Sequence, residues 1–291
     1  MMILAFPDYL SQAQRLAARL DVPLAEVVVH HFPDGESLIR LPPVLPEHLI
    51  VCRSLNQPND KLIELLLCAT TARELGGQRL TLVAPYLSYM RQDIANQPGE
   101  AVSQRIIGKL LAELFDDVLT VDPHLHRISS LTQAIPIKNA VTLTAANEIG
   151  LFLKEKFKHA VLLGPDSESK QWVGAIADNI GFDYAIADKN RLGDKQVEMS
   201  LPDSDFGKQP VVIIDDMAST GRTLAKAAGL LQAAGCKDIH AVVTHALFCG
   251  DAYAHILKAG VKNIWATDSI DHSSSCIRLD ALLADAIKAL D

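Results

Sequence analysis

Residues 211–223 combine an apolar strand pattern, two carboxylates and a short turn in a way that suits a phosphorylated sugar. The predicted strand ends in the two carboxylates, and a Ser/Thr/Gly turn then leads into a predicted helix. Free backbone N–H groups at a helix start bind phosphate, and a glycine lets the backbone approach closely. Carboxylates beside such an anion site suit the vicinal hydroxyls of a sugar, so the stretch predicts a ribose 5-phosphate site. The candidate ligands are Asp215, Asp216, Ser219, Thr220, Gly221 and Thr223.

Two other pairs of residues suit a polyphosphate. Lys189 and Arg191 follow a predicted strand in an acidic chain, so this loop either binds phosphates or is an exposed basic turn. Arg91 and Gln92 join a fixed cation to an amide beside the Pro-Gly loop at 95–102, whose composition favours mobility. This second pair suits ATP, although a solvated helix start has the same residues.

Candidate metal ligands follow two further strands. His124 and His126 stand two apart, so in an extended chain their side chains point the same way, and a neutral imidazole can bind a metal. For His126, a surface or capping role is the better interpretation. Asp166 follows an apolar strand, where a carboxylate can either meet Mg²⁺ and its waters or cap the next helix.

The turn at 32–36, Phe-Pro-Asp-Gly-Glu, places an aromatic ring beside two acids. The ring of Phe32 could stack on adenine, and the carboxylates of Asp34 and Glu36 could accept from its exocyclic amine. Pro-Asp-Gly is also a strong turn signal, so a plain hairpin with Phe32 in the core is the alternative. The chain has no GxxxxGK[ST] string, so it would hold ATP without a P-loop.

Short apolar runs alternate with helical patterns, and the second half repeats the plan of the first. The pattern predicts mainly parallel sheets flanked by helices, in two similar α/β domains at 1–143 and 144–291. The expected strands are His48–Val51, Leu80–Ala84, Val118–Val121, Ala160–Leu163, Tyr184–Ala187, Val211–Ile214, Ile239–Val243 and Ile264–Ala266. The expected helices are Lys61–Leu75, Ser103–Phe115 with Ser103 as its N-cap, Asn147–Phe157, Gln171–Asn179, Leu224–Ala234, Ala252–Lys258 and Leu279–Leu290.

The balance of residue types excludes several classes of protein. The chain has 291 residues and a net charge of −8, which argues against a broad nucleic-acid surface. Its five scattered cysteines form no CxxC pair, which is typical of a reducing compartment without structural zinc. The N-terminus lacks a signal-like segment and no apolar run could span a bilayer, so a cytoplasmic protein without membrane partners is expected.

The string at 211–223 resembles the phosphoribosyl-binding loop of the type I phosphoribosyltransferase fold. That fold serves transferases that consume phosphoribosyl diphosphate and synthetases that make it. The remaining blocks favour the second group, because in order and content they resemble those of the ribose-phosphate diphosphokinases. These blocks are 32–36, 56–64, 85–93, 121–124, 164–166 and 188–191.

The resemblance implies two tandem type I phosphoribosyltransferase-like domains, with ATP-side elements in the first and the ribose 5-phosphate site in the second. The implied reaction transfers the diphosphoryl group of ATP to the 1-hydroxyl of ribose 5-phosphate, giving phosphoribosyl diphosphate and AMP for nucleotide biosynthesis. Mg²⁺ is the implied cofactor, near His124 and Asp166. The implied ATP contacts are Arg91 and Gln92, and Lys189 and Arg191 would steady the transferred group.

The block at 32–36 reaches the ATP site of a neighbouring subunit in enzymes of this kind. Phe32, Asp34 and Glu36 would therefore contribute to ATP sites that are shared within a homo-oligomer.

The chain also departs from the family pattern. Many members have Asp where this chain has Ser219, Gly where it has Arg222, and small glycines where it has Ser167–Lys170. Ser219 and the Gly-Glu pair at 99–100 are similar to the archaeal branch. Two other functions stay open at this point, namely a phosphoribosyltransferase that consumes phosphoribosyl diphosphate and a non-catalytic protein that regulates a synthetase.

Overall fold

The computed structural model describes residues 1–192, 196–202, 206 and 209–290, and the side chains of all of these except 189–198. The chain forms two compact units. The first comprises Met1–Leu143 together with the C-terminal segment from Leu279, and the second comprises Thr144–Arg278.

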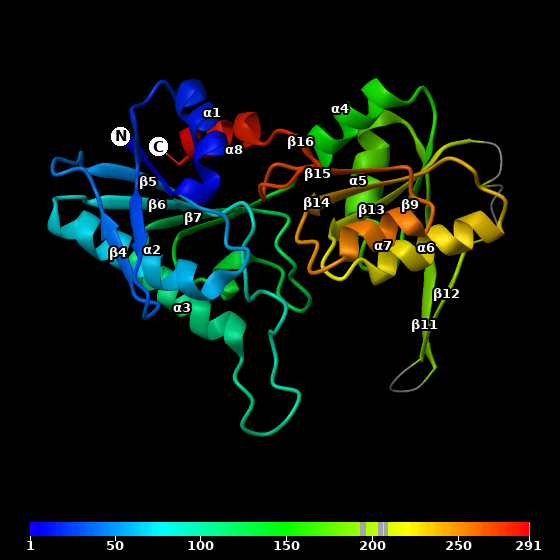
Figure 1. Ribbon diagram of the computed structural model, residues 1–291, viewed down its shortest axis with the longest axis horizontal. Helices are drawn as coiled ribbons and strands as arrows, with labels where there is room; N and C mark the ends of the chain where they lie inside the picture. Colours follow the sequence, from blue (N-terminus) through cyan, green and yellow to red (C-terminus); the bar gives the residue numbers. More distant parts are fainter. Residues whose placement is uncertain (193–195, 203–205, 207–208, 291) are drawn as a thin grey trace. The chain divides into compact units, whose positions relative to one another are not determined.

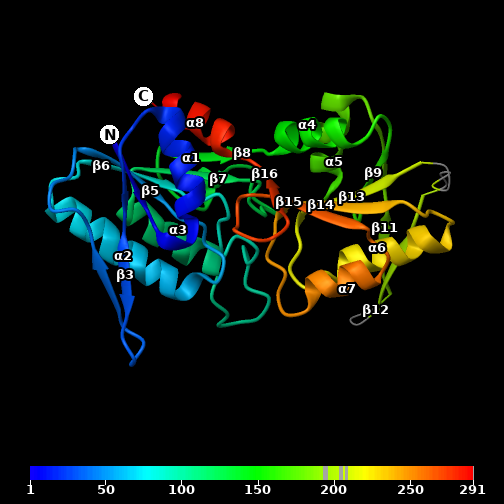
Figure 2. The ribbon, with the colours of Figure 1, turned by 45° about the horizontal axis from the view of Figure 1, so that its top comes forward.

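The first unit contains a six-stranded, wholly parallel sheet in the order β2-β1-β5-β6-β7-β8. Helices α1 and α8 lie on one face of this sheet and α2 and α3 on the other (Figures 1 and 2). The strands are β1 (Met2–Ala5), β2 (Leu24–Glu26), β5 (His48–Cys52), β6 (Arg79–Val83), β7 (Asp117–Val121) and β8 (Asn139–Leu143). The helices are η1 (Pro7–Tyr9), α1 (Leu10–Leu20), α2 (Pro58–Glu74), α3 (Ser103–Leu114), η2 (Leu131–Gln133) and α8 (Asp280–Lys288).

A separate antiparallel hairpin, β3 (Val28–His31) and β4 (Ser37–Arg40), belongs to the first unit. Helix α2 packs against β4, and the tip of the hairpin projects away from the sheet (Figure 2). The turn at 32–36 is therefore carried on a two-stranded arm and not by the main sheet.

Helix α8 joins the first unit, so the prediction that all of 144–291 forms one domain is wrong at its C-terminal end. The helix packs against α1, where the buried carboxylate of Asp280 accepts from the guanidinium of Arg19. Leu283 and Ile287 are buried on its apolar face. The sequence pattern predicts this amphipathic face but carries no information on which of two cores will bury it.

The second unit repeats the architecture, with parallel strands in the order β10-β9-β13-β14-β15-β16. Helices α4 and α5 lie on one face of the sheet and α6 and α7 on the other (Figure 1). The sheet strands are β9 (Val161–Gly164), β10 (Asp183–Ile186), β13 (Val211–Met217), β14 (Ile239–His245), β15 (Asn263–Thr267) and β16 (Ser275–Ile277). The helices are α4 (Ala146–Lys156), α5 (Lys170–Ile180), α6 (Arg222–Ala233) and α7 (Ala252–Lys258). A hairpin of β11 (Asp188–Leu192) and β12 (Gln196–Ser200) completes the unit.

The predicted strands and helices are confirmed within a few residues, and the expected α/β class with two sheets is correct. One predicted cap is wrong, because α3 begins at Ser103 itself and the Ser103 hydroxyl donates to Gln92 Oε1. Among the described residues, none of the helices combines the length and apolar composition that crossing a membrane requires.

Candidate active site

Three carboxylates lie at the carboxyl ends of two neighbouring strands of the second unit. Strand β13 continues to Met217, so Asp215 and Asp216 stand on the strand and not after it. Asp166 follows β9, which pairs with β13 in parallel. Burial and the negative charges of Asp216 and Asp166 raise the pKa of Asp215 well above its ordinary value. This group of carboxylates therefore favours the binding of a cation or of hydroxyl groups that donate hydrogen bonds.

The turn after β13 is held by the loop that follows β14. The Phe248 N–H donates to the Ala218 carbonyl at 2.8 Å, and the Cys249 N–H donates to the Ser219 carbonyl at 2.9 Å. This supporting loop escaped prediction, since its contacts are made by the backbone and leave no pattern in the sequence. These two hydrogen bonds fix the conformation of the turn that leads into α6.

Gly221 ends the turn in a conformation that favours glycine, with φ of +70°, and α6 begins at the next residue. A Cβ at this position would lie 2.9 Å from the Ile256 side chain and 3.0 Å from the Ala252 carbonyl oxygen. Ser219 and Thr223 are half-buried and Thr220 is exposed. Hydroxyls and the N–H groups of a helix start thus occur together, as an anion requires.

The carboxylate of Asp166 caps the turn that precedes α5. Its Oδ1 accepts from the backbone N–H groups of Glu168 (3.1 Å) and Ser169 (3.2 Å). These N–H groups belong to the turn before α5, whose N-cap residue is Ser169. The interpretation of Asp166 as the N-cap of this helix is therefore wrong, and metal binding by its carboxylate stays a prediction.

Lys189 and Arg191 lie on β11, paired in register with Met199 and Val197 of β12. They were expected in a short loop, and that expectation is wrong, because the strand pattern of 184–187 resumes after Ala187 as a second strand. The side chains of both residues fall outside the described part of the chain.

In the first unit, Gln92 is bound at both ends of its amide. Its Nε2 donates to Glu100 Oε1 at 3.2 Å, and its Oε1 accepts from the Ser103 hydroxyl at 2.8 Å. The second oxygen of Glu100 accepts from the N–H groups of Asn96 (2.6 Å) and Gln97 (3.0 Å). The loop at 95–102, expected to be mobile, thus contains a hydrogen-bonded turn, and the exposed Arg91 precedes it.

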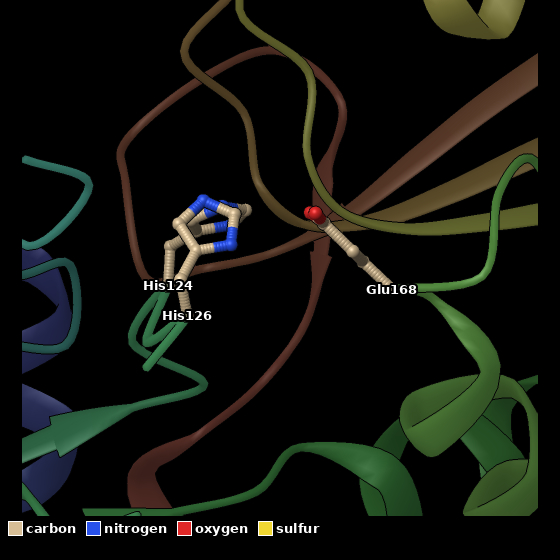
Figure 3. A group of neighbouring side chains, drawn as sticks. All are labelled: His124, His126 and Glu168. Carbon is tan, nitrogen blue, oxygen red and sulfur yellow. The ribbon is translucent and has the colours of Figure 1, made fainter. Parts of the chain in front are cut away.

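His124 and His126 follow β7 and turn their imidazoles toward each other. The two Nε2 atoms lie 2.8 Å apart, and the rings meet edge to face (Figure 3). The predicted common direction of the two side chains is confirmed. Figure 3 also draws Glu168, which belongs to the second unit.

The turn at 32–36 has the geometry of a tight hairpin. The Phe32 N–H donates to the Glu36 carbonyl at 2.8 Å, and the Glu36 N–H donates to Asp34 Oδ1 at 3.1 Å. Phe32 is 40% exposed and packs edge to face on His30, so its placement in the core, the alternative from the sequence, is wrong. A hollow of about 310 Å³ lies beside Glu36 and is lined by Gly35, Glu36, Ser37, Asp60 and Ile63.

The sheets and the loop at the start of α6 define a protein with the phosphoribosyltransferase-type fold. Residues 129–271 match the family model described as the phosphoribosyl transferase domain, and residues 1–114 match the N-terminal domain of ribose phosphate pyrophosphokinase. The fold is similar to that of the phosphoribosylpyrophosphate synthetase of Mycobacterium smegmatis, with a TM-score of 0.84, 24% identity, and 99% of this chain and 98% of that chain covered.

Proteins that are similar to this chain over its full length show which family within this fold it belongs to. The chain is 33% identical to the ribose-phosphate pyrophosphokinase of Methanopyrus kandleri, covering 100% of this chain and 99% of the relative. It is 31% identical to ribose-phosphate pyrophosphokinase 2 of Archaeoglobus fulgidus, covering 99% and 100% respectively. The chain therefore belongs to the ribose-phosphate pyrophosphokinase family and is a ribose-phosphate diphosphokinase.

Proposed function

We propose that this enzyme transfers the diphosphoryl group of ATP to the 1-hydroxyl of ribose 5-phosphate, giving phosphoribosyl diphosphate and AMP. The observation that carries this assignment is the loop at 215–223, where carboxylates on a strand precede the N–H groups of a helix start. The relatives named above bear the corresponding activity in their names.

The sugar phosphate binds to the second unit in this proposal. Asp215 and Asp216 accept from the ribose hydroxyls. The 5-phosphate accepts from the backbone and the hydroxyls of Ser219, Thr220 and Thr223. The absence of a Cβ at Gly221 lets the turn pack closely against Ala252 and Ile256. Arg222, exposed at the first position of α6, adds a cation beside the phosphate site where many family members have glycine.

Divalent metal chemistry fits the residues present. The raised pKa of Asp215 reports negative charge that a cation would offset, and His124 offers an imidazole nitrogen. Mg²⁺ prefers oxygen ligands, and in the second unit the Asp166 carboxylate would supply one. In the first unit, His124 would offer an imidazole nitrogen to a metal ion. When bound, the ion would neutralise the phosphate charge that develops during transfer.

The protein's own part in the reaction is mainly to position charge. Lys189 and Arg191 stabilise the transferred diphosphoryl group, and Arg91 and Gln92 contact ATP. The hydrogen bonds to Ser103 and Glu100 fix which end of the Gln92 amide donates and which accepts. Phe32, Asp34 and Glu36 contact the ATP bound by a neighbouring subunit, so the enzyme acts as a homo-oligomer.

One assay tests the reaction directly. Purified protein is incubated with ATP, Mg²⁺ and ribose 5-phosphate, and the products are separated and quantified. Equal amounts of AMP and phosphoribosyl diphosphate are expected, with neither formed when ribose 5-phosphate is left out. Formation of ADP, or no consumption of ATP under these conditions, would overturn the proposal.

A further inference from the structure

Glu64 of α2 is a fully buried carboxylate that lies outside the residues proposed to contact substrate. Its Oε1 lies 2.7 Å from His31 Nε2 and accepts from the Ser37 hydroxyl at 2.9 Å. Because an ionised carboxylate only accepts hydrogen bonds, His31 must carry its proton on Nε2. One buried oxygen therefore receives two donors from the hairpin.

The two donors bracket the turn at 32–36. His31 is the last residue of β3 and Ser37 is the first residue of β4. A two-stranded hairpin has little stability of its own in water, so a hairpin of this kind depends on what it packs against. Glu64 attaches both strands to α2 at the point where the turn begins and ends.

Arg53 supplies the charge that allows Glu64 to stay ionised. Its Nη2 lies 2.5 Å from Glu64 Oε2, and its guanidinium stacks over the Phe6 ring at 4.0 Å from the centroid. Burial alone would raise the pKa of Glu64, but Arg53 and the hydrogen bonds from His31 and Ser37 outweigh burial, so the pKa lies below its ordinary value. The Arg53 Nε also lies 3.3 Å from Asp8 Oδ1. The hairpin is thus tied to the core of the first unit through charged groups.

We propose that Glu64 is a positioning residue for the turn that carries Phe32, Asp34 and Glu36. It acts through its hydrogen bonds with His31 and Ser37, which fix the two ends of that turn. This inference rests on the proposed contact of that turn with ATP. A buried charge is costly, and hydrophobic packing could fasten α2 to β4 without one. Hydrogen bonds to both strands add what packing lacks, which is a fixed direction for the turn.

The test uses variants of the hairpin donors, of which His31 is exposed and Ser37 half-buried, because folding is less at risk there than at the buried Glu64. Ser37→Ala and His31→Ala each remove one donor, whereas Ser37→Thr and His31→Gln keep one. The two alanine variants should raise KM for ATP roughly tenfold, as expected for losing one hydrogen bond to a charged group. KM for ribose 5-phosphate should stay within about twofold, and the two conservative variants should recover most of the ATP affinity.

Two further variants complete the experiment. Glu64→Gln should raise KM for ATP at least as much as either alanine variant. Asp8→Asn, which changes the other carboxylate partner of Arg53 and leaves both hairpin donors in place, should leave it near the wild-type value. Equal loss for both substrates, or no difference between Ala and the conservative residues, would overturn the positioning role.

Glu36→Ala separates this inference from the proposal on which it rests. If Glu36→Ala leaves KM for ATP unchanged, the contact of the turn with ATP is wrong. If Glu36→Ala raises that KM while the Ser37 and His31 variants do not, the contact stands and Glu64 has only a structural part.

Discussion

Arg127 binds Asp93 through both its side chain and its backbone, with Nη1 2.6 Å from Oδ1 and the N–H 3.2 Å from Oδ2. Asp93 is buried, and it follows Arg91 and Gln92 directly. Arg127 directly follows His126. The contact therefore joins the loop proposed to bind ATP to the loop that carries the histidines, within one unit.

Removing this link should weaken ATP binding. Arg127→Ala leaves a buried carboxylate with fewer partners, so we expect kcat/KM for ATP to fall about tenfold, the scale of one hydrogen bond to a charge. Arg73→Ala is the control, because it breaks another Arg–Asp ion pair of the same unit, in which the carboxylate of Asp116 is exposed. The measurement is kcat/KM for ATP in both variants by steady-state kinetics. An equal loss in the two variants would show that Arg127 has no particular part in ATP binding.

Asp216 should control the affinity for the sugar. Asp216→Asn loses charge but little volume, and we expect KM for ribose 5-phosphate to rise about tenfold or more while KM for ATP changes far less. Asp238→Asn serves as the control, since Asp238 is an ion-paired acid on the amino-terminal side of β14. Unchanged ribose 5-phosphate kinetics in Asp216→Asn would exclude this carboxylate from the sugar site.

Lys189 should act chiefly in the transition state. A single electrostatic group of this kind typically contributes a factor of about a hundred or more to the rate, so Lys189→Ala should lower kcat by that order and leave substrate binding measurable. The readout is kcat at saturating substrates together with binding of each substrate alone. A loss of less than about threefold in kcat would mean that Lys189 belongs to an exposed basic strand.

The sequence predicted the secondary structure well because apolar periodicity is local, as the match of Ala252–Lys258 to α7 illustrates. It failed where long-range packing decides. The apolar face of α8 fits either core, and the exposure of Phe32 depends on how far the hairpin stands from the sheet. The substrate residues stay predictions, made from residue types and from the resemblance. The hydrogen bonds of Glu64 to the hairpin could be seen only in the structure, since nothing in a helical pattern marks one glutamate as buried.

Asp117 should make the fold of the first unit sensitive to acid. Burial alone would raise its pKa, but Arg79, Asn139 and Thr81 donate to its carboxylate and hold the pKa below the ordinary value. A depressed pKa in the folded state gives stability that is present above the unfolded value of about 4 and is lost as the pH falls through the folded value.

Asp117→Asn tests this balance through the free energy of unfolding. At pH 7 the variant should be less stable by roughly 2 kcal/mol, the scale of hydrogen bonds to a charged group. The difference from wild type should shrink as the pH falls below about 4, because the wild-type carboxyl then becomes protonated. Denaturant titrations at several pH values measure it. A difference that stays constant with pH would show that the loss comes from shape and not from charge.

Shared ATP sites make a prediction that no single-chain enzyme satisfies. In the proposed arrangement, Glu36 serves the site of a neighbour while Lys189 serves the site of its own chain. Glu36→Ala and Lys189→Ala proteins should each be nearly inactive, since each lacks one half of every site. When the two are unfolded together and refolded as a mixture, some sites combine an intact Glu36 with an intact Lys189. Activity should then return to roughly a quarter of the wild-type value for random assortment in a dimer.

The control is a mixture of the two proteins that are refolded separately and then combined without exchange, and it should stay inactive. Subunit exchange must be verified independently, for example by copurification of two different tags. A monomeric protein in solution, or no recovery after demonstrated exchange, would show that the turn at 32–36 does not serve a neighbouring subunit.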